Sequence, residues 1–314
     1  MRYLKILIIG LLLAAPGLAA ARTADVPGSA VWYFHIDLAQ MREDGPGKGL
    51  YLWLEDEALS EVKEESGIDL NKELDSLTAF ALDGEGPVIL FEGNISQDTR
   101  DKIMTFIAAA GDLKPLKSSG KAYYHFKGTD EDESIGLSDA DNNIEIQIDS
   151  LEEESWISLA LKNKVLITGS EEQMQAMLAN NGKIAGSKGH NGALLVLTAE
   201  KTMLQAGMNS ASFGDDGDSD WESNILRNTE QVAFLMAAAA NKLALEAELI
   251  TSEPEMAESL ASVVRGLISL MSFNDEIDAE TVAMLQGTTV KAKGNSLSIS
   301  LAIDPDLVIK TISD

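Results

Sequence analysis

The spacing of acidic residues is the first feature of this chain that could do chemistry. Asp216, Asp218 and Asp220 alternate as the carboxylates at positions 1, 3 and 5 of an EF-hand calcium loop do. Such a loop also needs Gly at its sixth position and Glu at its twelfth, where this chain has Trp221 and Arg227. These three aspartates are therefore the candidate calcium ligands, and a solvated acidic turn without metal is the alternative.

Short matches to catalytic motifs do not assemble into a complete site. The S-x-x-K pattern of penicillin-recognising enzymes occurs at 60–63 and 118–121, but the S-D-N and K-T-G elements of that chemistry are missing. We expect the first match on the polar face of a helix, and the glycine-rich stretch 45–49 in a turn. No nucleophile elbow, phosphate loop or zinc-protease motif is found in the sequence, which therefore predicts no catalytic residue and no cofactor other than calcium.

Three histidines, His35, His125 and His190, are too few and too scattered to predict a ligand set. We expect His35 to pair with a carboxylate or water beside its strand. With 51 acidic residues in the chain, two carboxylates can meet in the fold without leaving a sequence motif. A hydrolase is therefore the alternative to a non-catalytic role.

The N-terminus has the pattern of a secretory signal peptide over residues 1–21. Arg2 and Lys5 precede the apolar run, Pro16 interrupts it, and Ala19 and Ala21 are the small residues required for cleavage. The stretch 6–21 is short for a spanning helix, which needs roughly 20 apolar residues. A chain without cysteine has no site for a lipoprotein anchor. The sequence thus predicts a periplasmic or secreted protein with no membrane span after cleavage.

Composition narrows the class of partner. The chain has 24 basic and 51 acidic residues, a net charge of −27, which becomes −29 when Arg2 and Lys5 leave with the signal. Such a surface repels phosphate backbones, so nucleic acid is not an expected partner. The excess acid has two interpretations that the sequence leaves open, an environmental adaptation or a surface for a cation or a basic partner.

The mature chain reads as two similar α+β units in tandem, each a mainly antiparallel sheet with helices packed on one face. The predicted organisation is a first unit at 22–182 with an acidic insertion at 128–155, then a second unit at 193–314. Each unit opens with a strand and continues with a hairpin, a Ser-capped helix, a second hairpin and a short helix. Ser96 and Ser252 are the expected caps. The offsets between the units vary, so the copies differ by insertions.

The opening of the mature chain carries a family resemblance. Pro27, Ala30, an apolar strand over 31–36, and then Asp37 and Leu38 resemble exported bacterial proteins of uncharacterised function built from duplicated α+β units. That resemblance implies an extracytoplasmic α+β protein and supplies no catalytic residues. The leading functional hypothesis is a non-catalytic binding or interaction protein whose partner is a periplasmic protein or a small ligand. It would contact that partner through the acidic insertion and the cleft between the units. A periplasmic hydrolase and a calcium-binding envelope protein are the alternatives.

Overall fold

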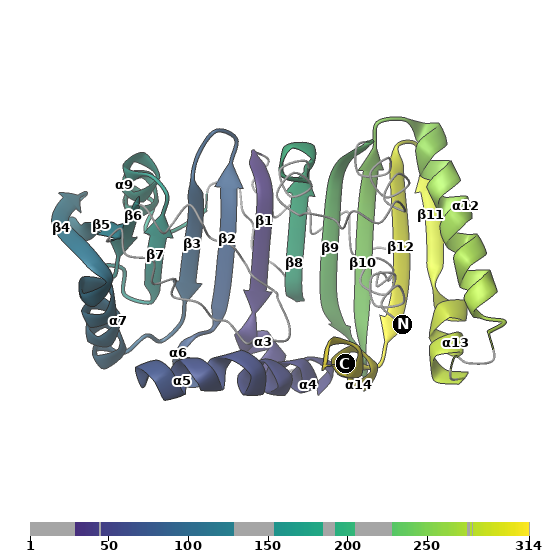
Figure 1. The fold of residues 1–314 in the computed structure, drawn as a ribbon, viewed down its shortest axis with the longest axis horizontal. Helices are drawn as coiled ribbons and strands as arrows, with labels where there is room; N and C mark the ends of the chain where they lie inside the picture. The colour runs from purple at the N-terminus through teal and green to yellow at the C-terminus, as the bar shows by residue number, and fades with distance from the viewer. Residues whose placement is uncertain are drawn as a thin grey trace.

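A twelve-stranded antiparallel sheet dominates the computed structural model, which describes residues 29–43, 45–128, 154–184, 192–204, 228–274, 277 and 279–313 (Figure 1). The chain is therefore α+β. The strands are β1 (Ala30–Asp37), β2 (Ser76–Leu82), β3 (Pro87–Glu92), β4 (Gly111–Ser118), β5 (Lys121–Gly128), β6 (Glu154–Ser158), β7 (Lys164–Thr168), β8 (Ala193–Glu200), β9 (Thr229–Ala239), β10 (Lys242–Thr251), β11 (Thr289–Lys293) and β12 (Ser296–Ile303).

One group of helices lies across the ends of the strands, and the others lie near the outermost strands of the sheet (Figure 1). The group at the strand ends comprises α3 (Leu38–Glu43), α4 (Gly45–Leu54), a π-helical turn (Glu55–Leu59), α5 (Ser60–Ser66), α6 (Leu70–Glu73) and α14 (Pro305–Ser313). The other helices are α7 (Gln97–Ala110), α9 (Glu171–Ala179), α12 (Pro254–Met271) and α13 (Ala279–Gly287). Among the described residues, none of these helices is both long and apolar enough to cross a bilayer.

The strand order joins the two halves of the chain in the middle of a single sheet. It runs β11-β12-β10-β9-β8-β1-β2-β3-β7-β6-β5-β4. The central contact is the antiparallel pair of β1 and β8, in which Phe34 lies opposite Leu197. The segments 22–182 and 193–314 thus contribute neighbouring strands to one sheet instead of each forming a sheet of its own.

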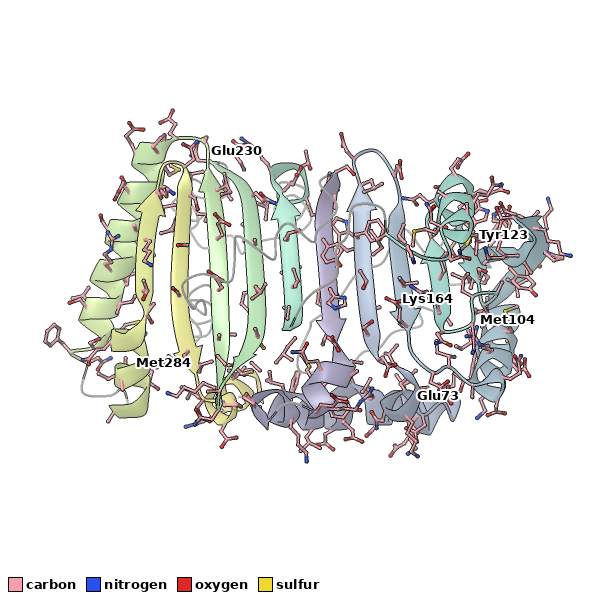
Figure 2. The ribbon with its side chains drawn as sticks, turned by 180° about the vertical axis from the view of Figure 1, so that it is seen from behind. Glu73, Met104, Tyr123, Lys164, Glu230 and Met284 are labelled. Carbon is pink, nitrogen blue, oxygen red and sulfur yellow. The ribbon has the colours of Figure 1, made fainter. Side chains whose placement is uncertain are left out.

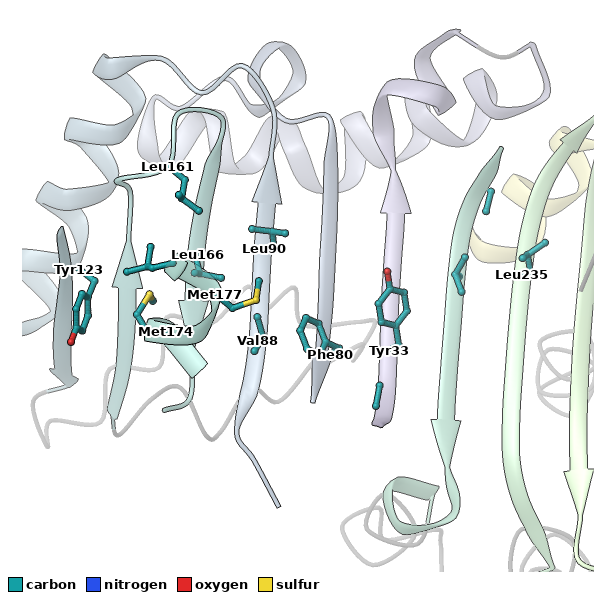
Figure 3. Packing of buried hydrophobic residues seen from close by; sticks show 14 of the residues in the cluster. Tyr33, Phe80, Val88, Leu90, Tyr123, Leu161, Leu166, Met174, Met177 and Leu235 are labelled. Atoms are coloured by element: carbon teal, nitrogen blue, oxygen red, sulfur yellow. The ribbon is translucent and has the colours of Figure 1, made fainter. Parts of the chain in front are cut away.

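One helix of each predicted unit packs on a face of this sheet, and the two helices lie on opposite faces. We call the two faces the Tyr33 face and the Ile36 face, after residues that alternate along β1. Helix α9 packs on the Tyr33 face, where its Met174 and Met177 join the cluster that contains Leu166 (Figure 3). Helix α12 packs on the opposite face, against the side chains of β11 and β12. Amphipathic periodicity identifies the buried stripe of a helix and not the face of the sheet that it covers, so the sequence did not specify which face each helix would take.

Most predicted elements exist, with two local corrections. The stretch Gly45–Gly49 is the first turn of α4 and not a loop, and Gly47 lies so close to Met41 that a Cβ would meet its Cα at 3.0 Å. The N-cap of α12 is Glu253, followed by Pro254 at N1, so Ser252 is not the cap. The proline fixes the first helical φ, and its missing N–H is one that has no partner within the helix in any case.

Other predictions are confirmed. Gly67, at φ 67°, ends α5 as expected, and its N–H binds the carbonyl of Lys63. Ser96 caps α7, with its hydroxyl accepting from the N–H of Thr99. The first S-x-x-K match begins α5, as expected, while the second forms the turn between β4 and β5.

Candidate functional site

A groove of about 730 Å³ lies on the Tyr33 face of the sheet. Its floor comprises side chains of β1, β2, β3 and β7, four neighbouring strands. One wall comes from α3, through Ala39 and Glu43, and another from the segment Gly182–Ile184 that follows α9. The volume falls in the range of small-molecule sites, roughly 300–1,000 Å³.

Residues paired across the four strands form rows along the floor, and the rows become less polar from one end of the strands toward the other. Asp37, Ser76, Glu92 and Lys164 lie side by side across the four strands. The next row, one alternation along each strand, is mixed and consists of His35, Thr78, Leu90 and Leu166. Beyond it comes a mainly apolar row of Tyr33, Phe80, Val88 and Thr168, part of which appears in Figure 3. From the second and third rows only His35, Thr78, Leu90 and Tyr33 line the groove, so a ligand would meet charge at one end and the apolar side chains of Leu90 and Tyr33 toward the other.

Two ion pairs organise the charged end. Lys164 Nζ lies 2.5 Å from Glu92 Oε1 and donates to the backbone carbonyl of Gly182 at 3.0 Å (Lys164 is labelled in Figure 2). On the other side, Arg42 of α3 pairs with Asp75 at 2.8 Å and also donates to the carbonyl of Leu74. Pairing of this kind holds each wall to the floor.

Asp37 is the carboxylate in this groove with a perturbed protonation equilibrium. Burial raises the pKa of Asp37, the backbone N–H of Gln40 lowers it, and the negative charge of Asp75 raises it again. The net shift of the pKa is upward. Asp37 Oδ1 accepts from Gln40 N at 2.8 Å, so the side chain also caps the first turn of α3.

His35 is buried in the floor, with 7% of its surface exposed. Its Nδ1 lies 2.8 Å from the hydroxyl of Thr78 on the neighbouring strand. The sequence had suggested a carboxylate or water as its partner. Tyr33 is 1% exposed, so the Tyr33 and His35 side of β1 is more buried than the side that carries Trp32 and Phe34.

Of the residues that the sequence singled out, His35 lines this groove. The candidate calcium ligands Asp216, Asp218 and Asp220, the signal peptide, and residues 129–153 of the predicted insertion 128–155 lie outside the described residues. The calcium site, the signal peptide and the role of the insertion therefore stay predictions. Within the described parts of the chain, no three His, Asp or Glu side chains are grouped as metal ligands. His125 pairs with Glu154 and stacks on Trp156 at the far end of the sheet, 4.9 Å between ring centroids.

Sequence reasoning missed the groove because its polar residues come from four separate segments. The one signal in the sequence was that these polar residues stand at the ends of predicted strands. Asp37 and Glu92 end apolar strands, and Ser76 and Lys164 begin them. Polar residues at strand ends are common, however, and only the strand order aligns these four in one row.

Comparisons with known proteins found structural similarity only. No family model matches the chain, and no curated protein matches it. Three crystal forms of TP0453 are similar in structure. Form IV has 11% identity and a TM-score of 0.46, covering 96% of this chain and 100% of that one. Form III has 10% identity and a TM-score of 0.43, with coverages of 93% and 97%. Form I has 12% identity and a TM-score of 0.41, with coverages of 93% and 96%.

Proposed function

We propose that this protein is an exported, non-catalytic binding protein whose ligand is a small polar molecule held in the groove on the Tyr33 face. The observation that carries the proposal is the groove itself, an open volume of about 730 Å³ with charges of both signs on one side. A ligand with both donor and acceptor groups would find partners in the charged row and apolar contact at Leu90 and Tyr33.

The bonding of the groove residues supports binding over catalysis. Lys164 is engaged by Glu92 and Gly182, and Arg42 by Asp75. The carboxylate of Asp37 caps α3. Each of these groups thus has a structural partner, which is the arrangement expected of a rigid, preformed binding surface.

The test fills the groove. Ser76→Trp introduces an indole into the floor, and Ser259→Trp makes the same change on the exposed side of α12 as a matched control. Wild type is screened by thermal shift against polar metabolites, and hits are confirmed by calorimetry. We expect Ser76→Trp to weaken binding at least tenfold and Ser259→Trp to leave it unchanged. Equal affinity in Ser76→Trp, or no hit with wild type in a broad screen, would refute the proposal.

A hydrolase is the second candidate, because Asp37 and Asp75 lie 38 positions apart in the sequence and interact electrostatically in the groove. A carboxyl with a raised pKa beside a second carboxylate is the pattern of an acid and base pair. The wild-type protein is assayed on chromogenic esters, glycosides and phosphates. If the wild-type protein hydrolyses one of these substrates and Asp37→Asn does not, this function is established. If the wild-type protein hydrolyses none of them, the function is excluded for those substrates.

Export and duplication belong to the same proposal. We infer that residues 1–21 are removed, so the mature protein begins at Arg22, which N-terminal sequencing of the secreted form tests directly. The strand order supports duplication, because β1-β2-β3-β7-β6 and β8-β9-β10-β12-β11 run outward from the centre with the same pattern of hairpins. This order also fits the resemblance to exported proteins with duplicated α+β units.

A further inference from the structure

We propose that Lys164 is a positioning residue that sets the width of the groove by tying the Gly182–Ile184 wall to strand β3. The inference rests on the proposed function, because it assigns a role to one wall of the proposed binding site. Its test is independent of any ligand.

The contacts of Lys164 connect three parts of the molecule. The residue lies on β7, opposite Glu92 of β3 in the sheet register. Its ammonium group is 2.5 Å from Glu92 Oε1 and 3.0 Å from the carbonyl oxygen of Gly182. The side chain is 21% exposed, so water screens these charge-assisted bonds less than it screens bonds at the surface.

The wall reaches the ammonium group because of a tight turn after α9. Asn181 and Gly182 both adopt positive φ, 54° and 69°, and the N–H of Gly182 binds the carbonyl of Met177 at 2.8 Å. A Cβ at Gly182 would lie 2.8 Å from Lys164 Cδ, so the wall lies directly against the lysine side chain. Ile184 then packs against the apolar cluster on the Tyr33 face.

No other contact from a charged side chain to this wall is found among the described residues. The turn itself holds Gly182 and Lys183 to the end of α9 through backbone bonds. Beyond the turn, the polar attachment of the wall to the sheet is the Lys164 bond to Gly182. Loss of the ammonium group would therefore leave only the packing of Ile184 to hold the wall to the floor, so the wall should open more often while α9 and its turn stay folded.

The absence of cysteine allows a clean labelling experiment. Ile184→Cys places a single thiol on the wall, and its rate of modification by a maleimide reports how often the wall opens. We expect Lys164→Met to raise this rate about tenfold, and Lys164→Arg, which keeps the charge and donors, to restore it to within about twofold of the parent. Lys162→Met, on the exposed turn before β7, is the matched control and should leave the rate unchanged.

Hydrogen exchange in the cysteine-free background gives a second measurement. Faster exchange in Lys164→Met should be confined to residues 182–184, with strand β7 unchanged. Labelling and exchange equal to those of the parent in a folded Lys164→Met protein would overturn the proposal, as would failure of Lys164→Arg to restore them. If Lys164→Met does not fold, Lys164→Leu is measured in its place, and an unchanged labelling rate there has the same meaning. Faster labelling in a protein for which no ligand is found would leave this inference standing and refute only the proposed function.

Discussion

The guanidinium of Arg100 donates a hydrogen bond of 2.6 Å to the backbone carbonyl of Leu159, 59 residues further along the chain. The same side chain donates to the carbonyl of Lys162 at 2.5 Å and to that of Ile95 at 3.3 Å. Arg100 is 8% exposed, and burial lowers its pKa although the negative charge of Glu73 opposes that shift. One buried cation therefore joins the start of α7 to the turn between β6 and β7.

Arg100→Met should lower the free energy of unfolding by about 2–4 kcal/mol, because several carbonyls lose a charged donor in a buried position. Arg265→Met is the matched control, since Arg265 makes one exposed hydrogen bond, to the carbonyl of Val290, and should cost less than about 1 kcal/mol. Urea denaturation followed by circular dichroism measures both. Equal losses in the two variants would contradict the role given to Arg100.

Two serines that looked alike in the sequence should respond differently to substitution. Ser96→Ala removes the cap of α7 and should cost about 1 kcal/mol, because the N–H of Thr99 loses its acceptor. Ser252→Ala should cost less than about 0.5 kcal/mol, since Glu253 and Pro254 begin α12. Thermal unfolding distinguishes the two variants, and a larger loss at Ser252 would show that the sequence had identified the cap correctly.

The raised pKa of Asp37 predicts a pH-dependent gain in stability for Asp37→Asn. Because the folded-state pKa lies above its usual value of 3.8, the folded protein binds this proton more tightly than the unfolded chain does. Stability is therefore lost as the pH rises through the folded-state pKa. Asn keeps an oxygen to cap α3, so Asp37→Asn should be more stable than wild type at pH 7 and similar to it below pH 3.8. Denaturation at the two pH values tests this, with Asp83→Asn in the turn after β2 as the control for a lost charge.

Two glycines should have opposite responses to alanine. A Cβ at Gly93 would lie 2.0 Å from the carbonyl oxygen of Glu73, so Gly93→Ala should cost more than about 2 kcal/mol or prevent folding. Gly266 lies in the middle of α12, is exposed, and has no atom within 4 Å of such a Cβ. Gly266→Ala should raise the unfolding free energy by about 0.5–1 kcal/mol through helix propensity. Melting temperatures that move in the same direction would contradict this pair.

Local elements could be predicted from the sequence because they depend on residues close in the chain. The hairpins β2–β3 and β9–β10 follow from alternating apolar residues on either side of a turn, and Gly67 marks a helix end through its positive φ. The hairpin β4–β5 was missed, since Pro115 and four lysines obscure its alternation. Such residues are typical of an edge strand, the position that β4 occupies.

The candidate site could not be predicted because it depends on long-range order. His35 lies on the face of β1 that looks polar in the sequence, yet His35 and Tyr33 on that face are both buried, and Tyr33 belongs to a hydrophobic cluster with residues of distant strands. The row that joins Asp37 to Lys164 requires β7 to lie beside β3, and no local pattern specifies that neighbour.

The pairing of β1 with β8 has a consequence for how the chain folds. The strand made first has an edge whose partner is synthesised more than 150 residues later. Until then its backbone N–H and C=O groups can recruit another chain, which makes the nascent protein prone to association. Closing so long a loop is a slow step, and chains with such distant contacts fold more slowly than chains built from local contacts. A holdase chaperone acting on the growing chain would shield that edge during the interval.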